Sequence, residues 1–126
     1  MIPINELQSK IYQVLSSLDI KVYDEVPLNS AMPLISIGDY NLSSIEYKGE
    51  GYMFEWTINI YTEYEGKKQV NELVSKAINK LYELSEANLN ELYSVNDVIL
   101  NNANINRLEG FYVANISIRI ETNEEV

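Results

Sequence analysis

The stretch that decides the fold is residues 54–84, FEWTINIYTEYEGKKQVNELVSKAINKLYEL. Up to Tyr61 it alternates apolar and polar residues, which is the period of a strand with one buried face. From Val70 the apolar residues recur at spacings of three and four, and this predicts an amphipathic helix that runs to about Leu84. The chain thus turns from strand to helix within a few residues, at a corner that is either an active site or a contact between molecules.

The start of this helix has two interpretations. Residues 62–65, Thr-Glu-Tyr-Glu, have the form of a capping box, but Gly66 in the first turn would cost about 1 kcal/mol relative to Ala, so a later cap is the alternative. Glu63 and Glu65 would be favoured by the helix dipole at its N-terminus. We prefer this capping role to a catalytic one for both carboxylates.

The other elements follow from the same two periods. Ile4 to Leu18 predicts an amphipathic helix that begins just after Pro3. Prolines make 26–33 a loop, and two glycines and two serines make 41–51 a connection longer than a tight hairpin turn. Strands are expected at 21–23, 34 to about 40, 52–61, 94–108 with an interruption or a bulge around 101–102, and 111 to about 122, with a turn at 109–110.

The order of these elements predicts the fold class. A helix, two or three strands, a second helix and a terminal hairpin indicate an α+β domain, with a mainly antiparallel sheet and two main helices packed on one face. At 126 residues the chain is the size of one domain, so we expect a single domain over 1–126. Residues 122–126 are predicted to be a mobile acidic tail.

The composition disfavours catalysis and metal binding. The chain has no Cys and no His, the usual nucleophile, general base and transition-metal ligands. Asp24 and Glu25 are adjacent, so on an extended backbone they point to different sides, and Gly49-Glu50-Gly51 leads into a strand rather than into a phosphate-binding helix. We therefore expect no catalytic residue, no cofactor and no metal ion.

The charge limits the partners. Nine basic against nineteen acidic residues leave a formal charge of −10, which repels nucleic-acid phosphates and anionic lipids. No secretory signal and no apolar segment of about 20 residues is present, so we expect a soluble protein made inside a cell, with no membrane partner.

Tyrosine is the anomaly of the composition, with ten residues against two Phe and one Trp. Tyr is enriched in protein interfaces because its ring is apolar while its hydroxyl stays hydrated. Several tyrosines fall on the 41–51 connection and on the strand-to-helix corner, and we predict a subunit or partner interface there. Its candidate residues are Tyr40, Ile45, Tyr47, Lys48, Tyr52, Tyr61, Glu63, Tyr64, Lys67 and Lys68.

Three segments together resemble a known family. They are VYDEVPLNSAMPLISIGDY (22–40), TINIYTEYEGKKQVNELVSKAINKLYE (57–83) and FYVANISIRI (111–120). In this order they are similar to the tail terminator and tail completion proteins of tailed bacteriophages and prophages. The likeness covers about residues 5–120 and is one of packing and turns, without a catalytic signature.

The resemblance implies a structural role. It implies a homo-oligomeric ring, expected to be a hexamer, that caps the tail tube, ends tail polymerisation and joins the tail to the neck or head connector. The partners implied are other copies of the chain, the tail tube protein and a neck or connector protein, with DNA only passing through the lumen without sequence recognition. The protein would act in the bacterial host cytoplasm and then in the virion tail, or in a tail-like particle.

The residues leave other functions open. One alternative is a neck or head–tail connector protein of the same fold. Another is an acidic binding module such as a DNA mimic, although the carboxylates are scattered over loops and both helices instead of one face. The third alternative, a small enzyme, is disfavoured by the missing His and Cys.

Overall fold

The sheet is built around one long central hairpin. The computed structural model describes residues 1–45, 51–63 and 65–124. In this part of the chain the order is α1 (Ile4–Ser16), β1 (Lys21–Tyr23), β2 (Leu34–Ile45), β3 (Gly51–Thr62), α2 (Lys68–Tyr82), β4 (Tyr93–Leu108) and β5 (Phe111–Glu124). The sheet order is β1-β2-β3-β5-β4, in which β1 is parallel to β2 and every other pairing is antiparallel. The predicted α+β class is confirmed.

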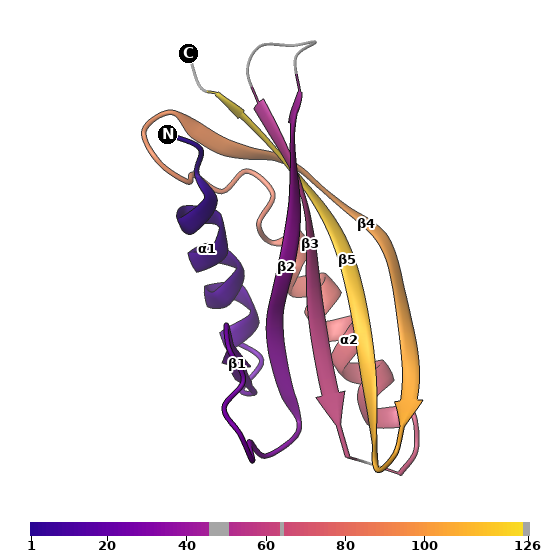
Figure 1. Cartoon of the computed structure of the whole chain (residues 1–126). Helices are drawn as coiled ribbons and strands as arrows, with labels where there is room; N and C mark the ends of the chain where they lie inside the picture. Colours follow the sequence, from indigo (N-terminus) through magenta and orange to yellow (C-terminus); the bar gives the residue numbers. More distant parts are fainter. Residues whose placement is uncertain (46–50, 64, 125–126) are drawn as a thin grey trace.

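Both helices share a core with the inner face of the sheet. The alternating residues of β3, Phe54, Trp56, Ile58 and Ile60, are buried, as the period of two predicts. They belong to one apolar cluster with the buried stripes of α1 and α2. Figure 1 shows α1 running beside β1, and α2 behind β3 and β5. The stripes are Leu7, Ile11 and Leu15 in α1, and Val70, Leu73, Ala77 and Leu81 in α2.

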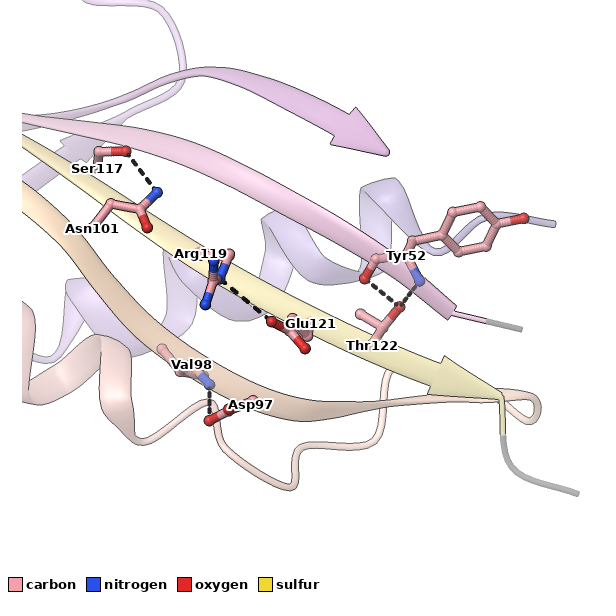
Figure 2. A network of polar contacts seen from close by, with 8 residues as sticks. All are labelled: Tyr52, Asp97, Val98, Asn101, Ser117, Arg119, Glu121 and Thr122. Carbon is pink, nitrogen blue, oxygen red and sulfur yellow. Dashed lines mark hydrogen bonds and ion pairs between the residues drawn. The ribbon is translucent and has the colours of Figure 1, made fainter. Parts of the chain in front are cut away.

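The opposite face of the sheet is polar. Thr57 and Asn59 on β3 pair with Ser117 and Asn115 on β5, and all four are half-buried. Figure 2 shows the helices behind the sheet, seen from the side of Ser117 and Arg119. We call this side the outer face and the helix side the inner face.

The connection predicted over 41–51 is wrong in its first part. Residues 41–45 continue β2 and pair with β3, from Asn41 opposite Glu55 to Ile45 opposite Gly51. Gly51 looked like a turn residue, but a Cβ at this position would overlap the backbone oxygen of Thr122. Its glycine is required because β5 approaches closely, not because the chain turns. Residues 46–50, which join the two strands, lie outside the described residues.

The helix starts and ends also differ from the predictions. The α2 helix begins at Lys68, after an N-cap at Lys67 that makes no side-chain capping bond, so the later of the two predicted starts is confirmed. Thr62 is a fully buried strand residue and is unable to cap the helix. The α1 helix ends at Ser16, two residues before the predicted end at Leu18. Asp19 then adopts φ 61°, a left-handed conformation common after helices.

The C-terminal hairpin agrees with the sequence except at its end and at a second, unpredicted bulge between Val95 and Asp97. The predicted bulge lies between Leu100 and Asn102, and Gly110 adopts φ 85° in the predicted turn. The tail was expected from residue 122, but β5 continues to Glu124 and Thr122 is buried. Its polar side chain is accommodated because its hydroxyl bonds the backbone of Tyr52, with O–O and N–O distances of 3.3 Å (Figure 2). Residues 125–126 lie outside the described residues.

Replacement of Ile58 tests the central position of β3. Ile58→Ala leaves a cavity beneath both helices, so we expect the free energy of unfolding to fall by about 2–5 kcal/mol in urea titrations. Thr57→Ala, on the outer face of the same strand, is the control and should change stability by about 0.5 kcal/mol or less. Equal losses for the two variants would show that the inner face does not carry the core.

Candidate functional site

The predicted interface residues lie in two places. Ile45 and Tyr52 flank the β2–β3 connection, and Tyr40 lies on the same half of β2, opposite Trp56. Tyr61 lies at the far end of β3. Tyr52 and Tyr61 are nine residues apart on one strand, which is about 30 Å. Glu63, Lys67 and Lys68 continue from the Tyr61 end into α2, and Tyr47, Lys48 and Tyr64 lie outside the described residues. The described candidates therefore form two separate surfaces instead of one.

The half of the hairpin nearer the β2–β3 connection carries an aromatic cluster at the rim of the core. The Tyr40 ring lies 6.0 Å from that of Phe54 and 4.7 Å from that of Trp56, and Tyr40 remains 38% exposed. Trp56 donates its indole N–H to the carbonyl oxygen of Gly38 over 2.9 Å, which satisfies its one polar group at the bulge in β2. The Tyr52 ring packs 5.8 Å from that of Tyr93. These tyrosines pack at the rim of the core as well as facing outward.

The corner end is apolar to an extent that the sequence did not indicate. The proline-containing loop and the ends of β2, β3 and β5 surround a hollow of about 460 Å³. Tyr61 and Phe111 form one wall, with ring centroids 6.2 Å apart, and Leu28 stands 94% exposed at its edge. The other apolar lining residues are Val26, Pro27, Met32 and Leu34. We call this the corner hollow.

A smaller charged hollow adjoins it. Glu63, Glu65 and Arg107 line a space of about 230 Å³ that shares Phe111 with the corner hollow. Arg107 donates to the hydroxyl of Tyr112 over 3.0 Å, and its guanidinium carbon lies 5.2 Å from the centre of that ring. This contact holds the guanidinium at the sheet while both glutamates remain exposed. The corner therefore combines an apolar hollow with a rim of mixed charge, which is typical of a protein contact.

The N-terminus of α2 is locally unfavourable. Its first turn contains no acidic residue and begins with the exposed pair Lys67 and Lys68. Positive charge at a helix N-terminus opposes the dipole, so these lysines do not serve the stability of the subunit. Within the described residues, neither lysine makes an ion pair. They are available for acidic groups of another molecule.

The outer face carries a ladder of amides and hydroxyls that sequence reasoning missed. Asn115 stands between Asn59 and Asn104 in the strand register and donates to Asn104 over 3.1 Å. Asn101 donates to Ser117 over 3.4 Å, and the next outer-face residue, Arg119, pairs with Glu121 over 3.4 Å (Figure 2). The ladder depends on the register after the β4 bulge, which is why the asparagines, scattered in sequence, gave no signal.

The described residues contain no group of three or more His, Cys, Asp or Glu side chains that could hold a metal ion. Within the same ranges, no helix is both long and apolar enough to cross a bilayer.

Comparison with solved structures gives one informative likeness. The chain has the same fold as a chain of the virion of a native gene transfer agent (GTA) particle, with a TM-score of 0.78 and 21% sequence identity. The match covers 94% of this chain and 95% of that chain, so it extends over nearly the full length of both. No protein-family model and no curated protein sequence matches the chain.

Replacement of Lys68 tests whether positive charge at the N-terminus of α2 lowers the stability of the subunit. Lys68→Glu places a negative charge in the first turn, so we expect the free energy of unfolding to rise by about 0.3–1 kcal/mol at low salt. Lys76→Glu, in the middle of the same helix, makes the same change in net charge and is the control. A stability for Lys68→Glu at or below that of Lys76→Glu would contradict the dipole argument.

Proposed function

We propose that this chain is a structural protein of a phage-like particle, and that it caps the tail tube as a tail terminator. The observation that carries the proposal is the nearly full-length likeness to a chain of a gene transfer agent virion. The family resemblance of residues 22–40, 57–83 and 111–120 supports the finer role. In this role the protein is not an enzyme and needs no cofactor.

The separation of the two candidate surfaces supports a joining role. A ring subunit that caps a tube contacts the tube at one end and a neck or head connector at the other, as well as its neighbours on both sides. The hairpin end and the corner end, about 30 Å apart, provide two such contacts. The corner hollow, with exposed Leu28 and a charged rim, is the stronger candidate for a protein partner.

Charge shapes the proposed ring. Six copies at −10 each give a formal charge of −60, so DNA would pass through the lumen without adhering to the wall. The same charge repels the subunits from one another. Lys67 and Lys68, which make no ion pair with the part of the chain that the structure describes, would offset this repulsion by meeting acidic groups across a head-to-tail interface.

Electron microscopy of the chain mixed with its tail tube protein tests the proposal. Tubes of defined length that end in a ring are expected, together with longer, uncapped tubes when the chain is omitted. A ring that binds the neck or connector protein but leaves tube length unchanged would instead identify a connector. A monomer that binds neither component would refute the virion role.

Ionic strength tests the charge argument. Because salt screens the repulsion between acidic subunits, we expect the ring population to rise as salt is added from low concentration through about 0.15 M. The measurement is analytical ultracentrifugation of the purified chain at fixed protein concentration. A ring population that falls over this range would show that cross-subunit ion pairs outweigh the repulsion.

A further inference from the structure

Each edge of the sheet is covered over one half only. On one edge β1 pairs with residues 34–36 of β2, and residues 40–45 of β2 pair with β3 alone. On the other edge, the segment after α2 bonds β4: Val95 donates to Ala87 over 2.8 Å, and Glu86 donates to Val95 over 3.1 Å. Tyr82 then accepts the N–H of Leu100 over 3.4 Å. Beyond it, residues 102–108 of β4 pair with β5 alone.

Both uncovered runs have little of the usual protection of an edge strand. Natural edges are guarded by lysines, prolines, bulges or short length, because free N–H and C=O groups recruit other strands. Residues 40–45 contain no charged residue and no proline, and residues 102–108 contain no proline and a single charged residue, Arg107, whose guanidinium is bonded to Tyr112 of β5. The bulges of β2 and β4 lie just before these runs, and within the runs the register is regular.

The two runs match each other in direction and in face. Along the sheet β2, β3, β5 and β4 alternate in direction, so β4 of one copy is antiparallel to β2 of a neighbour placed beside it in the same orientation. The inner-face residues Ala103 and Ile105 would then meet Tyr40 and Leu42. Asparagines of the outer face would meet Asn41 and Ser43.

We propose that the uncovered run of β4, residues 102–108, pairs antiparallel with the uncovered run of β2, residues 40–45, of a second copy of this chain. The pairing rests on the proposed ring and supplies its head-to-tail interface: each copy has one run of each kind, so the contact repeats until the ring closes. The two runs lie in opposite halves of the sheet. Ala103 pairs with Ile116, which pairs with Ile58 of β3, whereas Leu42 pairs with Phe54 of β3. Neighbours are therefore shifted along the strands, and the strands tilt to the ring axis, as closure of a sheet requires.

Disulfide trapping tests the pairing, because the natural chain has no cysteine. Ser43→Cys is combined with Asn102→Cys, Asn104→Cys or Asn106→Cys, which are successive outer-face positions of β4, so one of the three combinations is within disulfide reach. Under mild oxidation at the salt concentration that favours rings, that combination should give a ladder of covalent oligomers. Each single variant should give none.

Three results would overturn the pairing. Covalent dimers from Asn104→Cys alone would show β4 paired with β4 across a two-fold axis. Rings seen by electron microscopy without any cross-link in the three combinations would place the interface elsewhere and leave the proposed function standing. A chain that stays monomeric with and without its tail tube protein would refute both.

A lysine introduced into the uncovered β4 run tests the pairing without cysteine, through its effect on assembly. Ala103→Lys puts a charge on the exposed inner side of the uncovered β4 run, and we expect the assembled fraction to fall at least tenfold. Ser9→Lys, at an exposed position of α1, adds the same charge away from both edges and should assemble as the unmodified chain does. Circular dichroism spectra identical to that of the natural chain confirm that both variants are folded. Equal assembly of Ala103→Lys and Ser9→Lys would exclude the β4 edge from the interface.

Discussion

Burial of the inner face of β3 is the interaction on which the rest of the structure depends. Phe54, Trp56, Ile58 and Ile60 share one apolar cluster with the stripes of both helices, and β3 is the central strand of the sheet. A shift of one residue in the strand register would turn these four side chains to the outer face and point Thr57 and Asn59 into the core. The register of β2 and β5 is therefore fixed by the hydrophobic effect, and the positions of both candidate surfaces follow from it.

The length of the hairpin sets the distance between the two candidate surfaces, which matters for the proposed joining role. With β2 and β3 at twelve residues each, Tyr52 and the corner hollow around Tyr61 are held at opposite ends of one rigid ladder, and the aromatic cluster around Tyr40 lies between them, opposite Trp56. A subunit that joins two different structures benefits from contacts that are far apart and do not move relative to each other. The polar outer face between them, with its amide ladder, has only a few charged groups in a protein of formal charge −10.

Several features are poorly explained by the stability of an isolated subunit. The Lys67–Lys68 pair opposes the dipole of α2, Leu28 is almost fully exposed, and strand residues 40–45 and 102–106 carry no charge at the edges of the sheet. Positions that break local rules tend to mark function. All three become reasonable if the chain works as an assembled structural subunit, and no acid–base or nucleophilic chemistry needs to be invoked.

The sequence by itself determined the α+β class, the strand-to-helix switch, the bulge near Asn101 and the absence of His and Cys chemistry, because these depend on local periodicity and composition. It misassigned residues 41–45, since the serines of an exposed strand look like a loop, and it misread Gly51, whose role depends on the close approach of Thr122. It also grouped Tyr52 with Tyr61, which the strand holds about 30 Å apart. Only the tertiary structure decided the corner hollow, the amide ladder and the uncovered edges, because each depends on which strands are neighbours and in what register, and side-chain periodicity within one segment does not carry that information.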